Sequence, residues 1–158
     1  MARELITSWG DYQTAIDRLL AIACQKICIY DEDLSQFKLE SALRLAEIKR
    51  VLHSGHKETL QIVLRNADLL RNRIPVMLKL LTDFSHLASA QQTQPDLAHL
   101  RDSMLIIDGK HALIRFERDL PRSKLLLNEA DELKPYLNRF FELSSAGGEL
   151  VGVTSLGL

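Results

Sequence analysis

The sequence predicts an α/β fold in which helices flank both faces of a mixed sheet. Three observations support this prediction. Segments in which apolar residues recur with helical spacing alternate with short runs rich in apolar and β-branched residues. Two of these runs, 26–31 and 59–65, are separated by a helical segment, which is the order of a parallel βαβ unit. The segment 103–116 places Asp-Gly between two apolar runs, which is typical of an antiparallel hairpin.

The length and composition indicate one globular domain over residues 1–158, with 46% hydrophobic and 26% charged residues. A net charge of -1 provides no overall attraction to nucleic acid or to an anionic membrane, so binding to nucleic acid is not expected. No apolar run approaches the ~20 residues that span a bilayer, and the N-terminus lacks the basic-then-apolar order of a signal peptide. We therefore expect a cytoplasmic protein without a membrane partner.

A first helix is expected to begin near Gly10 and Asp11. Its apolar stripe, with helical spacing, comprises Tyr12, Ala15, Ile16, Leu19, Leu20 and Ala23. Trp9 beside it is expected to cover the end of the core, or with Tyr12 to form a stacking platform. The strand 26–31 follows and runs into an acidic stretch. Ser41 is the expected N-cap of a second helix that stops at Gly55, before the strand 59–65.

In the second half, Pro75 is expected to open a helix, because proline suits the first turn. A thin strand over 86–93, the hairpin and the strand SKLLLN follow. The last helix has Asn128 as its expected N-cap, Pro135 is expected to break off its first turn, and the Gly-Gly pair at 147–148 ends it. The closing ELVGVTSLGL is expected to form a loose tail or an edge strand.

The cysteines and a histidine pair carry no metal-site pattern. Cys24 and Cys28 are expected to be small buried residues, since a CxxxC spacing supplies too few ligands for a metal. His53 and His56 have H-x-x-H spacing but no third ligand nearby, and we expect them to form a solvated helix end. We expect neither a metal nor another cofactor.

The hairpin SMLIIDGKHALIRF, together with the elements around it, resembles one half of the phospholipase D superfamily. The motif of that superfamily is His-x-Lys-x4-Asp followed by Gly-Ser, and two such motifs meet in one site. With the motif aspartate at Asp108, its histidine falls on Arg101, its lysine on Ser103, and its Gly-Ser on Arg115 and Phe116. Arginine cannot be deprotonated at a usable pH, so Arg101 cannot act as the nucleophile. The resemblance therefore implies the fold with a degenerate motif and without ordinary phosphodiester hydrolysis.

Within the superfamily the chain is similar to an uncharacterised bacterial family, related to the C-terminal domain found behind GNAT acetyltransferase domains. This similarity rests on the segments KICIYDEDL, FSH at 84–86, PRSKLLLN and TSLGL, together with the hairpin. The acetyltransferase half is absent from this chain. The resemblance thus implies an acetyltransferase as a partner supplied in trans, and no acetyl transfer by this chain alone.

The resemblance also implies where a site would lie, at the carboxyl end of the strand 26–31 and the start of the hairpin. The polar residues expected there are Asp31, Asp33, His86, Arg101, Arg115 and Arg122. They have two interpretations. One is an ion-pair network remaining in a site that lost its chemistry. The other is a site that still binds an anion or phosphate-containing ligand, since guanidinium suits phosphate.

Three functional hypotheses follow. The first is a non-catalytic phospholipase D-like binding or interaction module that forms a homodimer, because relatives with one motif per chain combine two copies. The alternative is a divergent phosphodiesterase or nuclease with a site rebuilt around His86 or His99. The third is an accessory domain of an acetyltransferase. Asp108 is expected to be a turn residue only, and Lys110 and His111 to be solvated.

Overall fold

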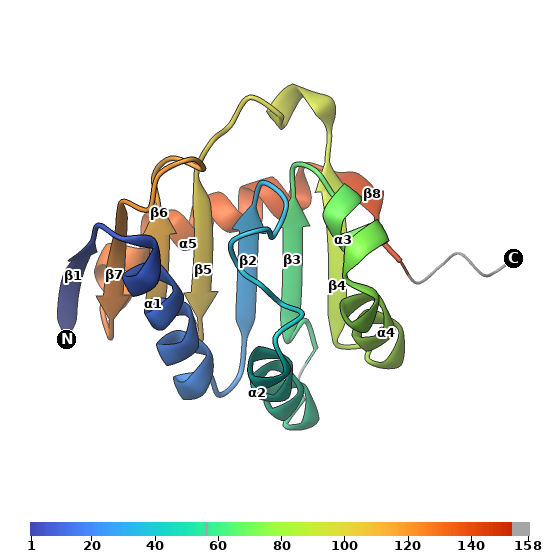
Figure 1. Cartoon of the computed structure of the whole chain (residues 1–158), viewed down its shortest axis with the longest axis horizontal. Helices are drawn as coiled ribbons and strands as arrows, with labels where there is room; N and C mark the ends of the chain where they lie inside the picture. The colour runs from blue at the N-terminus through green and yellow to red at the C-terminus, as the bar shows by residue number, and fades with distance from the viewer. Residues whose placement is uncertain (56, 153–158) are drawn as a thin grey trace, which may run out of the picture.

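The computed structural model describes residues 1–55 and 57–152. In this part of the chain, the strands form one eight-stranded sheet in the order β1-β7-β6-β5-β2-β3-β4-β8 (Figure 1). The strands are β1 (Ala2–Ile6), β2 (Ile27–Asp31), β3 (Leu60–Leu64), β4 (Ala88–Thr93), β5 (Ser103–Ile107), β6 (His111–Arg115), β7 (Ser123–Leu127) and β8 (Gly148–Leu150). β2, β3 and β4 are parallel, and the other pairings are antiparallel. The predicted mixed sheet is confirmed.

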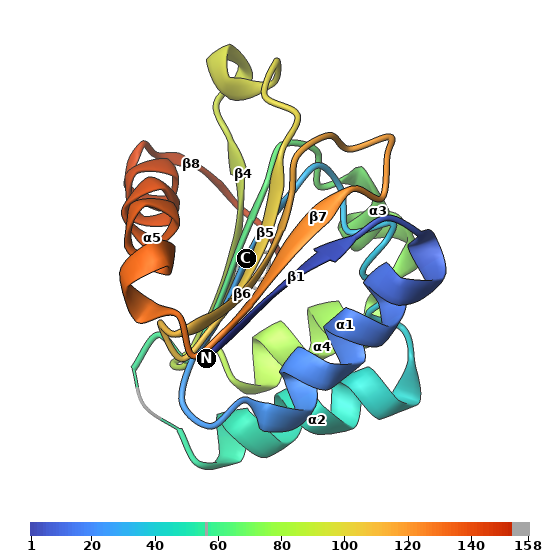
Figure 2. The same cartoon turned by 90° about the vertical axis from the view of Figure 1, so that its left-hand side faces the viewer.

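Helices cover both faces of this sheet, as predicted. They are α1 (Trp9–Ile22), α2 (Ala42–His53), α3 (Asp68–Arg73), α4 (Pro75–Asp83) and α5 (Ala130–Ser145), with a short 3₁₀ turn at Pro95–Leu97. Figure 2 shows α1 to α4 on one face and α5 alone on the other. No helix in the described ranges is long and apolar enough to cross a membrane.

Side chains alternate along each strand, and the sheet therefore separates two hydrophobic clusters. Ile29 and Leu105 belong to the larger cluster under α1 to α4. Tyr30 and Met104, their neighbours along the strands, belong to the cluster that packs with Phe140 of α5. The central strands β2, β5 and β6 are buried at every position because both faces are covered.

Local signals placed most elements correctly. Ser41 caps α2 with its side chain, and Pro75 is the first residue of α4. Asp108 and Gly109 have φ of 56° and 69°, the paired positive values of a type I′ hairpin turn. The thin strand over 86–93 is β4, and part of the closing segment is the edge strand β8.

Several local predictions were wrong. β1 and α3 were not predicted. Glu129, not Asn128, is the cap position of α5, and Pro135 lies inside that helix rather than breaking off its first turn. Cys24 is exposed, whereas Cys28 is buried as expected, and burial raises the pKa of the Cys28 thiol to about 12.

His53 lies where it was predicted, whereas His111 does not. His53 is exposed at the end of α2, as expected, and its ring packs edge-on against Phe84. His111 was expected to be solvated but is buried, and its Nδ1 accepts the N–H of Asn128 at 2.9 Å. His56 and the closing TSLGL segment lie outside the described residues.

Candidate functional site

The candidate site lies at the edge of the sheet where β2 and β6 end and β5 begins, the upper edge in Figure 1, which we call the polar edge. The strand register brings these ends together. Tyr30 of β2 pairs with Met104 of β5, and Ser103 pairs with Arg115 of β6. Asp31, the last residue of β2, therefore comes close to the end of β6 although the two are far apart in sequence.

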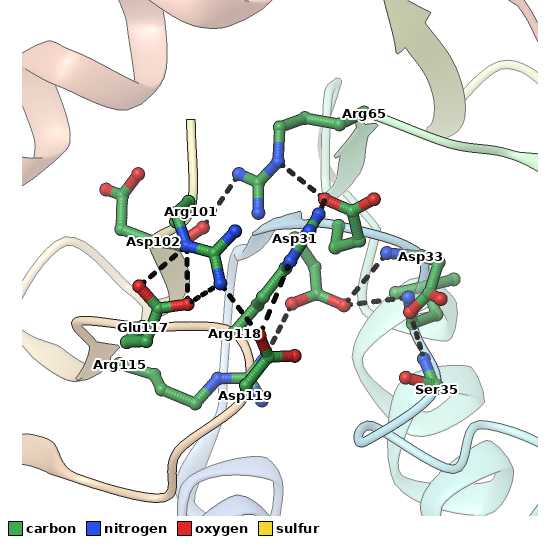
Figure 3. Close-up of polar contacts among 12 residues, drawn as sticks. Asp31, Asp33, Ser35, Arg65, Arg101, Asp102, Arg115, Glu117, Arg118 and Asp119 are labelled. Carbon is green, nitrogen blue, oxygen red and sulfur yellow. Dashed lines mark hydrogen bonds and ion pairs between the residues drawn. The ribbon is translucent and has the colours of Figure 1, made fainter. Parts of the chain in front are cut away.

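A buried ion pair between Asp31 and Arg115 forms the centre of this site (Figure 3). Arg115 Nη2 donates to Asp31 Oδ1 at 2.7 Å, and the two side chains are 2% and 1% exposed. The other carboxylate oxygen of Asp31 accepts backbone N–H groups from Leu34 at 2.7 Å and Asp33 at 3.3 Å. Because removing one partner of such a pair leaves an uncompensated buried charge, each residue requires the other.

Aromatic rings of α1 lie against the Arg115 guanidinium. Its Cζ is 5.0 Å from the ring centre of Tyr12 and 5.4 Å from that of Trp9. Burial raises the pKa of Tyr12 to about 12, so its hydroxyl stays protonated at neutral pH. Trp9 and Tyr12 thus close the core, as expected, and also provide π-faces for a cation. Nε and Nη1 of Arg115 are buried and have no hydrogen-bond acceptor among the described residues.

A second layer of ion pairs surrounds the first. Glu32 Oε1 accepts from Arg65 Nε and Arg118 Nη1, both at 3.0 Å. Arg65 is 1% exposed at its side chain, lies over the Tyr30 ring and donates to the backbone carbonyl of Asp102 at 2.8 Å. This layer fixes the start of β5 to the ends of β2 and β3.

Arg101 lies at the rim of the site rather than in it. Its side chain is 43% exposed, its Nε donates to both carboxylate oxygens of Glu117 at 2.6 and 2.7 Å, and its Nη2 donates to Asp119 at 2.7 Å. The hydrogen bond from Arg101 lowers the pKa of Glu117. Two carboxylates therefore already pair with the guanidinium of Arg101.

A pocket of about 230 Å³ opens at the polar edge. Its lining residues are Glu32, Asp33, Ser35, Arg115, Arg118 and Asp119. Asp33 is half-buried, and its carboxylate accepts the backbone N–H of Ser35 at 3.0 Å. No cation among the described residues pairs with Asp33. The same part of the chain holds no cluster of three or more His, Cys, Asp or Glu side chains suited to a metal ion.

The structure brings four of the six expected site residues to the polar edge in contact with its network or pocket: Asp31, Asp33, Arg101 and Arg115. Arg122 precedes β7 at the same edge but is exposed on the side of α5, where it lines a hollow with Leu5 and Phe116. His86 is exposed before β4, at the opposite edge, because β4 runs parallel to β2 and only begins there. Placing His86 in the site was therefore wrong.

The sequence reasoning missed several charged residues of this network: Glu32, Arg65, Asp102, Glu117, Arg118 and Asp119. The signal for three of them was present in the run Glu117-Arg118-Asp119, which follows the hairpin immediately and so must lie at the polar edge. Arg65 follows the last residue of β3 in the same way. A search for charged residues just after the carboxyl end of each strand would have identified this run and Arg65.

Asp108 lies at the edge opposite to the site, and it is more than a turn residue. Its carboxylate accepts the backbone N–H groups of Cys24, Gln25 and Lys26 at 2.9, 2.7 and 2.8 Å. The hairpin turn thereby fastens the connection between α1 and β2.

Residues 9–146 match a family model described as a domain of unknown function, DUF7931. The chain belongs to this family. No curated protein matches it in sequence.

Solved structures resemble the chain in fold. TrmBL2, an archaeal chromatin protein whose structure is described as showing a novel mode of DNA binding, has a TM-score of 0.68 at 16% identity, over 96% of this chain and 55% of TrmBL2. The chain thus spans about half of that protein. Nuc, a phospholipase D family member from Salmonella typhimurium, has a TM-score of 0.65 at 11% identity, over 96% and 99% of the two chains. NucT from Helicobacter pylori has a TM-score of 0.59 at 12% identity, with the same coverage. The chain has a phospholipase D-like fold.

Proposed function

We propose that this chain is a non-catalytic phospholipase D-like binding module that holds an oxyanion on Arg115. The observation that supports this proposal is that the buried guanidinium of Arg115 has N–H donors without acceptors. Arg115 is buried beside a pocket, and Asp31 uses only Nη2, so Nε and Nη1 remain without acceptors. An unsatisfied donor in a buried charged group is costly, and an oxyanion in the pocket would relieve that cost.

The absence of catalysis is part of the proposal, and it rests on the histidines. Phosphodiester cleavage through a covalent intermediate needs a histidine next to the phosphate-binding groups. His86 is at the opposite edge, and His99 is exposed in the segment between β4 and β5, which stands off beyond the sheet in Figure 2. Within the described part of the chain, the hydrogen-bond partners of Arg101 are Glu117 and Asp119, and Asp31 pairs with Arg115, so neither histidine contacts this network.

Titration with inorganic phosphate, followed by calorimetry and ³¹P NMR, tests the binding. Removing Arg115 alone would leave the Asp31 carboxylate buried and unpaired, so the test variant is Asp31→Asn/Arg115→Met. We expect phosphate binding in the wild type and in Asp31→Asn, and none in the double variant. Arg122→Gln is the matched control, because it removes an exposed arginine of the same edge. Equal binding by the double variant, or no binding by the wild type, contradicts the proposal.

The same preparations test the alternative of a divergent phosphodiesterase or nuclease. We expect no hydrolysis of bis(p-nitrophenyl) phosphate and no cleavage of single-stranded or double-stranded DNA. Hydrolysis that disappears in His99→Gln would show that the chain is an enzyme and would contradict the non-catalytic binding module. We also expect no retention of DNA, because Glu32, Asp33 and Asp119 line the pocket and would repel a polyanion. TrmBL2 provides the positive control for DNA binding.

We further propose that the module acts as a homodimer. Phe116 and Leu120, in the connection between β6 and β7, are 45% and 55% exposed at the polar edge. Apolar side chains beside a binding pocket suit a symmetric contact between two copies. Light scattering after size-exclusion chromatography should give twice the mass of the chain, and Phe116→Ser/Leu120→Ser should give the single mass. A monomeric wild type would contradict this proposal.

An acetyltransferase partner is supported by the family resemblance alone. Affinity purification of the tagged chain from its native host tests it. Recovery of an acetyltransferase that is lost with Phe116→Ser/Leu120→Ser would support the partnership, and its absence from the purified material would contradict it.

A further inference from the structure

The pocket at the polar edge is lined by two side chains of opposite charge that have unused hydrogen-bonding capacity. Arg118 pairs with Glu32, and Asp119 pairs with Arg101. Arg115 retains two nitrogens without acceptors, and Asp33 has no cationic partner among the described residues. Both residues line the same pocket of about 230 Å³.

We propose that this pocket takes a small zwitterion with the chemistry of a free amino acid, its oxyanion on Arg115 and its ammonium on Asp33. This inference rests on the proposed function and names the ligand class of the same site. A zwitterion can contact both side chains at once. A ligand with only one charge would contact either Arg115 or Asp33 and leave the other without a ligand contact.

The charges of the lining favour a zwitterion over a simple anion, which binds Arg115 more weakly. Two arginines and three carboxylates line the pocket, and Asp31 lies directly behind Arg115. A free anion on Arg115 would therefore approach several carboxylates at close range, which is unfavourable where solvent screening is incomplete. An ammonium on the same molecule converts the nearest of these repulsions into an attraction.

The loop after β2 holds Asp33 in position for this role. Figure 3 shows the Asp31 carboxylate between Arg115 on one side and the backbone of the Asp33 loop on the other. Asp31 accepts the Asp33 N–H at 3.3 Å, and Asp33 accepts the Ser35 N–H at 3.0 Å. A carboxylate has about four lone-pair sites, so Asp33 retains acceptor capacity for an ammonium. Arg115 and the backbone of Asp33 are thus linked by hydrogen bonds through Asp31.

Separate titrations with small molecules that differ in their charges test the inference. Glycine, β-alanine and 4-aminobutyrate carry both charges at increasing separation, acetate carries only the anion, and ethylammonium carries only the cation. Titration is followed by ¹⁵N–¹H chemical shifts of the full chain. We expect one of the zwitterions to bind about tenfold more tightly than acetate, and ethylammonium to bind more weakly than both.

Variants separate the two ends of the ligand. Asp33→Asn should bring the affinity for the best zwitterion down to that for acetate, and acetate itself should bind equally or more tightly because one repelling carboxylate is removed. Asp131→Asn, an exposed carboxylate on α5, is the control and should change neither affinity. Asp31→Asn/Arg115→Met should abolish the binding of both molecules.

The outcomes distinguish this inference from the proposed function. If acetate and phosphate bind through Arg115 but no zwitterion exceeds acetate, or if Asp33→Asn has no effect, the zwitterion inference is overturned and the oxyanion site stands. If the wild type binds no anion at all, the proposed function fails and the inference fails with it.

Discussion

Ser103 and Arg115 face each other across β5 and β6, and both side chains are buried. From the resemblance to phospholipase D, the motif lysine was expected at Ser103. The positive charge at this place comes from the neighbouring strand, where Arg115 pairs with Asp31 at 2.7 Å. The hairpin thus places one buried cation at the polar edge, on β6.

Moving the cation between the two strands tests this relationship. Ser103→Lys places a second buried cation beside one carboxylate, and we expect a loss of about 3 kcal/mol in the free energy of unfolding. Ser103→Lys/Arg115→Ser returns the balance to one cation and Asp31, and should recover a large part of that loss. Urea unfolding of the four proteins in a double-mutant cycle measures the coupling. Additive effects would show that the two positions do not share one charge site.

Breaking the central ion pair should be more harmful than replacing it. Arg115→Met leaves the Asp31 carboxylate buried without its cation, and we expect a loss of about 3–5 kcal/mol in the free energy of unfolding. Asp31→Asn/Arg115→Met should lose less than Arg115→Met, because no uncompensated charge remains. Thermal unfolding followed by circular dichroism ranks the variants. The opposite order would mean that water reaches Asp31 and screens its charge.

The Asp108 carboxylate should contribute to stability independently of the turn. Asp108→Gly retains the positive φ of the turn but leaves the N–H groups of Cys24, Gln25 and Lys26 without this acceptor. Because these donors can partly reach water, we expect a loss of about 2 kcal/mol. Asp108→Asn, which keeps one acceptor oxygen, should lose less. Amide exchange at 24–26 should accelerate in Asp108→Gly, and unchanged exchange there would contradict this role.

Acidification should destabilise the hairpin through His111. Burial, followed by the positive charge of Lys110, lowers the pKa of His111 below its ordinary value, and Nδ1 accepts from Asn128 only in the neutral ring. The folded state therefore binds fewer protons than the unfolded state. The stabilisation is fully present above the unfolded pKa of about 6.5 and is lost as the pH falls from there toward the folded value.

The measurement compares urea midpoints at about pH 7.5 and about pH 5 for the wild type and His111→Gln. Carboxylates titrate in both proteins. The difference between the two proteins in the change of midpoint with pH therefore isolates the contribution of the histidine. We expect the wild type to lose more stability on acidification. Equal losses would show that protonation of His111 does not oppose folding.

The central elements could be predicted because their signals are local. The stripe of α1, the Ser41 cap and the Asp-Gly turn each depend on a few neighbouring residues. β1 could not be identified in this way, since Arg3 and Glu4 interrupt its apolar pattern and its partner in the described sheet, β7, is distant in sequence. Pro135 was misjudged because packing of Phe140 and Leu143 holds α5 together across a residue that disfavours helix.

The site residues could be predicted where the ends of their strands could be located from the sequence. Asp31 and Arg115 come together because β2 and β6 both pair with β5, and the hairpin signal predicted the second of these pairings. His86 was misplaced because its strand was recognised but the direction of that strand was not used. The partners of Arg101 could not be foreseen, since loop conformation decides which carboxylates reach it.

The pairing of β1 has a consequence for the order of folding. Ala2 lies opposite Leu127, so β1 cannot find its place until the chain as far as β7 has been synthesised. Closing such a distant contact late is slow, and a waiting strand can pair with wrong neighbours. The charges of Arg3 and Glu4 discourage those pairings. They keep the nascent segment available for β7.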